Sequence, residues 1–368
     1  MFQIGDKVCL FKKSLYGLKQ AGRVWFETLS AWIKSIGLTE FQADRCCYFI
    51  TQGRKVLILT IYVDDFLIFT NDEALQTDII ESLGRIFPMK ELGSAQYCLG
   101  IRITQLPQER TILLDQAEDI RRVMARFNME GSKPVATPTD PAIKLQKRSE
   151  GEEPTGAPYR EAVVCLIHIS QTTRPDVCHA VGVVSQICSD PSNAHWSAVK
   201  RILRYLNSTI DLRLKFDGNA AEGVEAYSDS DWGGCTESRR STTGYAVMAA
   251  GACVSWASKK QRTVALSSTE AEYMACSAAC QEIKWILNFR ELPTLWCDNQ
   301  GAILLSANGI QHQRTKHIDL RHHFFRDMVR DGLVAVKYVS TQDMIADILT
   351  KDLHRETFEK CRAKLGLG

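Results

Sequence analysis

Beyond Gly223 the sequence alternates between strand-like and helix-like patterns, and this alternation limits the fold more than any other feature of the chain. The patterns predict strands at 224–228, 243–248, 252–257 and 262–266, a helix over 268–287, a strand at 294–297, and then further helices. This order predicts a mixed β-sheet with helices packed on it.

Four acidic residues lie where these predicted elements begin or end. Asp229 ends the first strand in AYSDSDWGG, Glu270 opens the long helix in LSSTEAEYMA, Asp298 ends the later strand in LWCDNQGA, and Asp347 lies in a terminal helix in DMIADILTK. Taken singly, each acid is explained as a helix cap or a solvated turn. Together they predict carboxylates that converge over one sheet edge. Such a cluster suits two Mg²⁺ ions roughly 3.5–4 Å apart, which can hydrolyse a phosphodiester.

Two neighbouring features are interpreted differently. Glu272 would point about 200° away from Glu270 on a helix, so we predict a surface position for it. The spacing of His317, His322 and His323 does not present one ligand face, which disfavours zinc. The basic residues of this segment are instead predicted to contact nucleic-acid phosphates, with a plain solvated helix as the alternative: Arg314, Lys316, His317, Arg321, His322 and Arg326.

At these residues the segment resembles the ribonuclease H domain of copia-type retrotransposon Pol polyproteins. The similarity runs through YSDSDWGG, SSTEAEY, WCDNQGAI, RTKHIDLRHHF and ADILTK, over about 224–353. It implies that Asp229, Glu270, Asp298 and Asp347 bind two Mg²⁺ ions, with Mn²⁺ as a substitute. It also implies that a metal-held water attacks RNA paired to DNA.

The N-terminal half holds a helix predicted over 21–36 and a β-hairpin predicted over 55–70. In VLILTIYVDDFLIFT, Asp64 and Asp65 are predicted to form a two-residue turn, where adjacent like charges suggest a bound cation. KVCLFKKSLYGLKQAGRVWFETL resembles the copia-type reverse transcriptase segment beside the incoming nucleotide. This resemblance implies metal binding by the two aspartates and polar contacts from Lys19, Gln20 and Arg23.

The resemblance continues through MKELGSAQYCLGIRI, TRPDVCHAV and HWSAVKRILRYL, with departures at Gly22 and at Val164-Cys165, where the family usually has Pro and Gly-Ser. In this family a further catalytic aspartate and the fingers region precede LYGLKQ, where this sequence offers only Asp6. We therefore expect a partial palm with little polymerase activity from this chain alone.

Between the two halves the patterns predict a strand at 101–105, a helix over 115–127, a linker over 133–156, and two helices within 159–207. The expected class is an α+β or α/β multidomain protein. The expected domains are a partial reverse transcriptase palm (1–105), a thumb-like segment with the linker (106–157), a connection module (158–222), a ribonuclease H-like domain (223–355) and a C-terminal tail (356–368).

The composition of the chain limits where in the cell we expect the protein and what we expect it to bind. No apolar stretch reaches the ~18 residues that cross a bilayer, and no secretory signal is visible, so we expect a cytoplasmic (virus-like particle) or nuclear protein. The thirteen cysteines are interpreted as reduced thiols. Expected partners are an RNA/DNA hybrid or template-primer, other Pol parts or a second copy. The alternatives are a non-catalytic or domesticated nucleic-acid-binding remnant, and a remnant that folds poorly.

Overall fold

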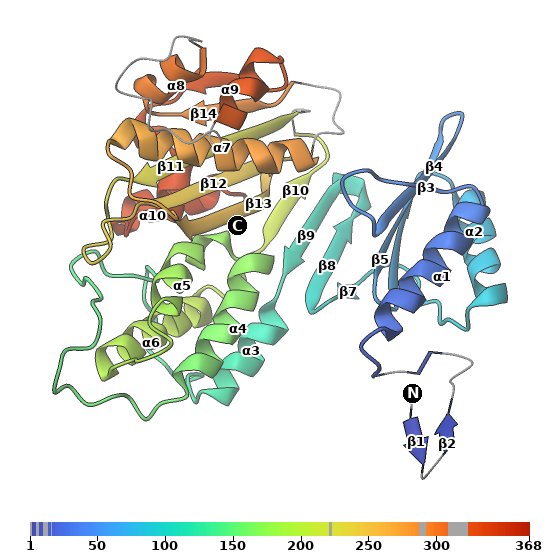
Figure 1. Ribbon diagram of the computed structural model, residues 1–368, viewed down its shortest axis with the longest axis horizontal. Coiled ribbons are helices and arrows are strands. Elements are labelled where there is room, and N and C mark those ends of the chain that lie inside the picture. Colours follow the sequence, from blue (N-terminus) through green and yellow to red (C-terminus); the bar gives the residue numbers. More distant parts are fainter. Residues whose placement is uncertain are drawn as a thin grey trace. The chain divides into compact units, whose positions relative to one another are not determined.

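The chain forms two compact units, Met1–Ala95 and Gln96–Gly368. The computed structural model describes residues 2–4, 7–9, 14–15, 17–220, 223–286, 292–307 and 323–368. Figure 1 labels the elements along the chain. None of the described helices combines the length and the apolar character that crossing a bilayer requires.

Unit 1 is built on an antiparallel sheet in the order β3-β4-β5-β6. Its members are β3 (Thr39–Glu40), β4 (Cys47–Gln52), β5 (Lys55–Tyr62) and β6 (Asp65–Thr70), preceded by the short pair β1 (Phe2–Ile4) and β2 (Lys7–Cys9). Every second residue of β5 is buried, and these side chains pack with α1 (Ala21–Ser35) and α2 (Glu73–Ile86) in one core. The predicted helix and hairpin are confirmed.

Unit 2 begins with a second antiparallel sheet and a group of helices. The sheet order is β10-β9-β8-β7, formed by β7 (Tyr97–Cys98), β8 (Ile101–Leu106), β9 (Thr111–Asp115) and β10 (Leu214–Asp217). The helices are α3 (Ala117–Arg126), α4 (Tyr159–Thr172), α5 (Cys178–Ser185) and α6 (Asn193–Ser208). We predicted two helices within 159–207, but α4, α5 and α6 are three, because both proline breaks interrupt the helical backbone.

The predicted linker, 133–156, forms neither helix nor strand, as expected. It is nevertheless fastened to α6. Arg204 Nε donates to Lys133 O at 2.7 Å, and Ser208 Oγ donates to Val135 O at 3.1 Å. A ring nitrogen of His195 lies 2.6 Å from Gln146 O. The linker is therefore held against α6 by hydrogen bonds.

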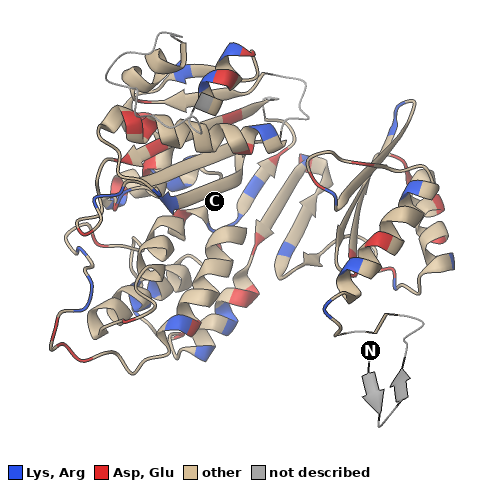
Figure 2. Ribbon diagram, in the orientation of Figure 1, with Lys and Arg blue, Asp and Glu red and all other residues tan. Residues whose placement is uncertain are grey.

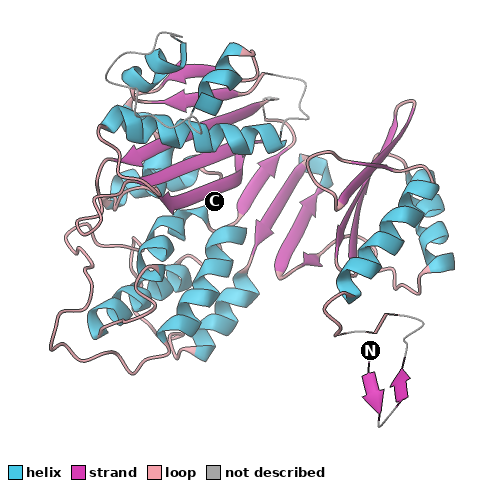
Figure 3. Cartoon of the chain, viewed as in Figure 1, coloured by secondary structure: helices cyan, strands magenta, loops and turns pink. Residues whose placement is uncertain are grey.

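A five-stranded mixed sheet, in the order β13-β12-β11-β14-β15, forms the rest of unit 2. Its strands are β11 (Val224–Asp231), β12 (Thr242–Ala249), β13 (Ala252–Lys260), β14 (Thr294–Cys297) and β15 (Ala335–Tyr338). The first three are antiparallel, whereas β14 runs parallel to β11 and β15 parallel to β14. Figure 3 shows helices beside this sheet, which confirms the expected mixed architecture: α7 (Ser268–Ile286), α8 (Gln300–Ala307) and α9 (His323–Arg330).

Two sequence predictions at this sheet were wrong or incomplete. Residues 262–266 form no strand, because β13 continues to Lys260 and the chain then turns toward α7. Trp232 Nε1 donates to Ala265 O at 3.2 Å, so this segment bonds to a side chain and not to a sheet ladder. Strand β15 was not predicted, because four residues give too short an alternation to recognise.

The C-terminal residues belong to the core of unit 2. We expected 356–368 to be a tail, but α10 (Arg355–Lys364) follows the 3-10 helix η6 (Ile345–Leu349), and Phe358 and Cys361 are buried. One continuous apolar cluster joins them to residues of α3–α6, β12 and β13. The helical part of unit 2 and its mixed sheet therefore share a core.

Candidate metal centre

The ends of β11 and β14 place two aspartates side by side. The strands are parallel, and Tyr227 of β11 pairs with Trp296 of β14. Asp229 and Asp298 each follow two residues later, so the register puts them at the same level, near the ends of these neighbouring strands. Asp229 is 1% exposed, and Asp298 Oδ2 accepts a hydrogen bond from Thr341 Oγ1 at 2.8 Å.

The 3-10 helix η6 brings Asp347 against the same strand end. Gly244 of β12 pairs with Asp229, and a methyl group added at Gly244 would lie 2.6 Å from Thr350 Cγ2 and 2.9 Å from Leu349 Cβ. Because glycine leaves this space open, η6 approaches closely enough for Thr350 Oγ1 to donate to Asp229 Oδ2. The glycine is thus required for the contact between β11 and η6.

We expect Gly244→Ala to push η6 away from the sheet. The free energy of unfolding should fall by about 1–3 kcal/mol, because the added methyl group overpacks a filled site. Urea unfolding measures this loss. Gly131→Ala is the matched control, because its added methyl group meets nothing within 4 Å. Equal stability of the two variants would contradict the role of Gly244.

Lys351 neutralises part of the charge at this site. Its Nζ lies 2.9 Å from Asp347 Oδ1 and 3.2 Å from Asp229 Oδ1. Burial and the charge of Asp229 raise the pKa of Asp347 to about 6, against the opposing effect of the lysine. Burial disfavours the charged form of Lys351, but the two carboxylates outweigh it and raise its pKa. The two acids of β11 and η6 therefore favour a cation beside them.

Glu272 is the acid of α7 that joins this group, and our prediction of a surface position was wrong. It is 6% exposed, and its Oε1 accepts a hydrogen bond from Ser230 N–H at 3.2 Å. A carboxylate oxygen of Glu272, Cys297 Sγ and a carboxylate oxygen of Asp298 all lie within 4.8 Å of one another. Burial, with the nearby charge of Asp229, raises the pKa of Glu272 to about 10.

Glu270, the acid that we predicted as a ligand, faces the turn before α7. Its Oε2 accepts a hydrogen bond from Leu266 N–H at 2.7 Å, and its own N–H donates to Ser267 Oγ at 3.1 Å. The two glutamates do point apart on the helix, as their spacing predicts. The structure reverses which of them faces the strand ends.

The residues present fit a divalent cation. The donor set is four carboxylates, Asp229, Glu272, Asp298 and Asp347, and hard oxygen donors are the ligands that Mg²⁺ prefers. Glu272 Oε2 is buried and has no hydrogen-bond partner among the described residues. A buried carboxylate oxygen without a donor is costly, and a cation would remove that cost.

One signal in the sequence could have identified Lys351. It follows Asp347 by four residues, a spacing that brings a basic and an acidic side chain together on one helical turn. The packing role of Gly244 had no comparable signal, because a glycine in a strand only indicates a bulge or a close approach in general. Glu272 was recognised in the sequence, but it was predicted on an exposed face of the helix and is in fact buried.

In unit 1 the predicted aspartate turn is shifted by one residue. Tyr62 pairs with Asp65, so the turn residues are Val63 and Asp64, and Asp65 begins β6. Val63 has φ 59°, a conformation that is strained for a β-branched residue, and its carbonyl accepts a hydrogen bond from Trp25 Nε1 at 2.6 Å. Both aspartates are exposed. The two aspartates therefore do not share the turn, and their like charges no longer indicate a cation bound there.

The polar residues that we associated with a nucleotide lie at the start of α1. Lys19 and Gln20 precede the helix, and Gln20 is its N-cap without a side-chain cap bond. Arg23 is exposed and pairs with Glu27 at 2.7 Å. The bond from Trp25 to the β5–β6 turn brings the first turns of α1 near Asp64. Nucleotide contacts from these residues stay predictions.

Most of the predicted basic segment lies outside the described residues: Arg314, Lys316, His317, Arg321 and His322. Arg326 is described as a half-buried residue of α9. The adjacent Phe325 packs edge-on against Tyr273 of α7, with ring centroids 5.3 Å apart, so α9 is fixed to the helix that carries Glu272. Phosphate contacts from this segment stay predictions.

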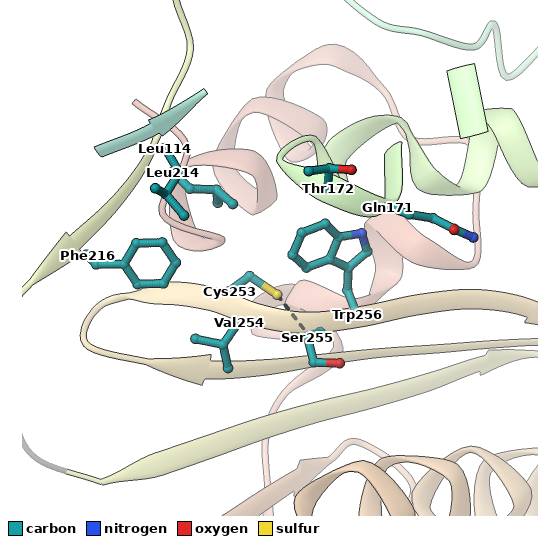
Figure 4. Close-up of a pocket in the computed structure, with 9 residues that line it drawn as sticks. All are labelled: Leu114, Gln171, Thr172, Leu214, Phe216, Cys253, Val254, Ser255 and Trp256. Carbon is teal, nitrogen blue, oxygen red and sulfur yellow. Dashed lines mark hydrogen bonds between the residues drawn. The ribbon is translucent and has the colours of Figure 1, made fainter. Parts of the chain in front are cut away.

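A separate cavity of about 270 Å³ lies between α4, β10 and β13, as Figure 4 shows. Phe216 and Trp256 line it, and both Trp256 Nε1 and Cys253 Sγ donate to backbone carbonyl groups. None of the four clustered acids lines this cavity. The acid cluster is therefore separate from this cavity.

Comparisons with known proteins find relatives along the whole chain. Residues 2–141 match the family described as reverse transcriptase (RNA-dependent DNA polymerase). The chain is 41% identical over its full length to the retrovirus-related Pol polyprotein from transposon TNT 1-94 of Nicotiana tabacum, and covers 29% of that protein. It is 38% identical over 98% of its length to the Pol polyprotein from transposon RE2 of Arabidopsis thaliana, and covers 25% of it.

The chain thus spans about a quarter of the length of these curated relatives. Among solved structures, LC11-RNase H1 in complex with RNA/DNA hybrid matches 37% of this chain and 97% of its own, at 11% identity and a TM-score of 0.28.

Proposed function

Because the chain belongs to the family of copia-type retrotransposon Pol polyproteins, we propose that the mixed sheet of unit 2 is a ribonuclease H domain. In this proposal it hydrolyses the RNA strand of an RNA/DNA hybrid with two Mg²⁺ ions, for which Mn²⁺ can substitute. The observation that carries the proposal is the convergence of four carboxylates from β11, α7, β14 and η6 at one edge of the sheet.

Asp229, Glu272, Asp298 and Asp347 would hold the ions. When bound, a pair of divalent cations lowers the pKa of the attacking water and stabilises the charge that develops on the phosphoryl oxygens. The protein's own groups fix the geometry. Ser230 N–H orients the carboxylate of Glu272 through a hydrogen bond of 3.2 Å. Thr341 Oγ1 orients the carboxylate of Asp298 through a hydrogen bond of 2.8 Å. Such supporting bonds hold ligands in a productive arrangement.

Lys351 supports the site in a different way. Its ammonium group lies between Asp229 and Asp347, where it offsets the repulsion of two carboxylates that are forced together by η6. Removing this charge would leave a buried carboxylate without its partner, which is strongly unfavourable in a protein interior. We infer that Lys351 positions these two acids and does not react itself.

The substrate and the role of unit 1 are further parts of the proposal. An RNA/DNA hybrid suits a cluster of acids that hydrolyses phosphodiesters, and it is the nucleic acid bound in the LC11-RNase H1 complex. Unit 1 would be part of a polymerase palm in which Asp64 and Asp65 bind metal and Lys19, Gln20 and Arg23 contact a nucleotide. The family match over 2–141 supports this part.

Hybrid cleavage tests the proposal directly. The purified chain should release short RNA fragments from a labelled RNA/DNA hybrid in Mg²⁺, and no fragments in a chelator. Asp298→Asn should abolish the release, because it removes one charged ligand while keeping the size of the side chain. Asp217→Asn, at the end of β10, is a control for loss of one aspartate elsewhere in unit 2. A folded wild-type protein that never cleaves the hybrid would end the proposal.

A further inference from the structure

The two segments beside the acid cluster are strongly basic. Residues 232–241 join β11 to β12, and residues 259–266 end β13 and lead to α7. Together they hold five Lys or Arg residues and one acid: Arg239, Arg240, Lys259, Lys260 and Arg262, with Glu237. We call this surface the strand-end platform. Figure 2 colours its cations blue.

The platform is held together as one surface. Gly233 N–H donates to Ser241 Oγ at 3.0 Å, and Gln261 N–H donates to Ser241 O at 2.8 Å. The buried Gln261 side chain donates to Ser230 Oγ, Thr243 Oγ1 and Ala271 O, and so ties the end of β13 to β11 and α7. The segments that carry the cations are therefore held in fixed positions at this end of the sheet.

Strand register places this surface next to the acids. Lys260 pairs with Thr242, which pairs with Asp231, so these residues form one row across the sheet. Residues in such a row, and Asp229 two positions earlier, face the same side. Two strand spacings and two residues separate the Cα atoms of Lys260 and Asp229 by roughly 12 Å, which corresponds to about three to four base pairs along the axis of a duplex.

Most of these cations have no acidic partner. Arg239, Arg240, Lys259 and Arg262 are exposed, and none of them forms an ion pair within the part of the chain that the structure describes. Glu237, the only acid of the platform, pairs with Lys147 at 2.8 Å. Unneutralised cations at one end of a sheet attract a polyanion.

An aromatic ring lies on the same surface. Trp232 follows Asp231 directly, its side chain bonds across to Ala265 O, and the residue is 60% exposed. An exposed indole is unfavourable in water but stacks on bases and sugars of nucleic acids. Cations together with an aromatic ring favour a nucleic-acid backbone over an acidic peptide.

We propose that the strand-end platform binds the phosphate backbone of the duplex that is cleaved at the acid cluster, about three to four base pairs along the duplex axis from the cleaved bond. This inference rests on the proposed ribonuclease H function and adds a substrate-binding surface to it. Phosphate contacts would fix the position of the duplex on the sheet edge without selecting its sequence.

Salt-dependent binding tests the platform. The variant combines Arg239→Ala, Arg240→Ala, Lys259→Ala and Arg262→Ala, and hybrid binding is measured by fluorescence anisotropy in an Asp298→Asn background. We expect the Kd to rise about tenfold or more, and the slope of log Kd against log salt to fall by about one for each phosphate that the variant no longer binds. The matched control removes four exposed arginines elsewhere in unit 2: Arg121, Arg122, Arg126 and Arg355.

The outcomes separate the platform from the nuclease itself. Cleavage by the platform variant with Asp298 intact should show a raised KM and a kcat within about twofold of wild type, because the acids are untouched. If the control variant loses as much affinity as the platform variant, only net charge matters and the platform is wrong. If wild type cleaves the hybrid and the platform variant binds it normally, the proposed role of the platform is wrong, whereas the proposed nuclease activity is supported. Absence of cleavage by wild type refutes the nuclease, whatever the binding result.

Discussion

Glu272→Gln is expected to reduce hybrid cleavage about a hundredfold to a thousandfold, whereas Glu270→Gln is expected to stay within about tenfold of wild type. The reason is geometric. Glu272 lies beside Ser230 N–H, Cys297 and Asp298, while the Glu270 carboxylate bonds to Leu266 N–H at the start of α7. Initial rates of RNA fragment release in Mg²⁺ give the comparison.

The two glutamate variants control for each other, because each replaces one carboxyl group of the same helix by an amide and both side chains are buried. Binding of Mn²⁺, measured by calorimetry, adds a readout that does not depend on turnover. Only Glu272→Gln should weaken it. If Glu270→Gln alone abolished cleavage and metal binding, our assignment of the α7 ligand would have to be reversed.

The second large effect is a loss of stability with rising pH when metal is removed. The pKa of Glu272 is about 10 in the folded protein and 4.5 in a free side chain, because burial and the charge of Asp229 disfavour its ionised form. Above pH 4.5 the unfolded chain loses this proton while the folded protein keeps it. The free energy of unfolding should therefore fall as pH rises, by up to about 1.4 kcal/mol per pH unit.

Urea unfolding of wild type in a chelator, between pH 5.5 and pH 8.5, measures this fall. Asp347, whose pKa is about 6, adds a smaller decrease in the acidic part of the range. Glu272→Gln should lose much less stability, because its amide does not titrate, and Glu270→Gln should behave as wild type. Added Mg²⁺ should offset the fall at high pH, since it favours the ionised carboxylates. Parallel pH profiles for all three proteins would contradict the prediction.

Sequence patterns predicted elements well where local signals were strong. The helix over 21–36 and the strand at 294–297 agree with α1 and β14 because apolar periodicity and turn residues mark their ends. The hairpin of β5 and β6 was found, but its turn was displaced by one residue. A turn with Val63 at positive φ contradicts the preference for Asn, Asp or Gly, so local chemistry could not place it.

The acid cluster was predicted only in part, and α7 explains why. Its buried residues occur around almost the whole helix, from Glu270 through Ile283, because the sheet covers one side and α8 and α9 cover another. Amphipathic periodicity identifies a buried face only when another face meets solvent. The spacing of the glutamates showed that they diverge, but only tertiary packing decides that Glu272 reaches the strand ends.

The core shared by α3–α6, β12, β13 and α10 has a practical consequence for anyone dissecting this chain. A fragment spanning 223–355, the domain that we predicted from sequence, would leave the inner faces of β12 and β13 uncovered and would lack the buried Phe358 and Cys361. Exposed apolar patches of this kind promote aggregation. Recombinant expression of the proposed nuclease should start from 96–368, the unit that the chain itself forms.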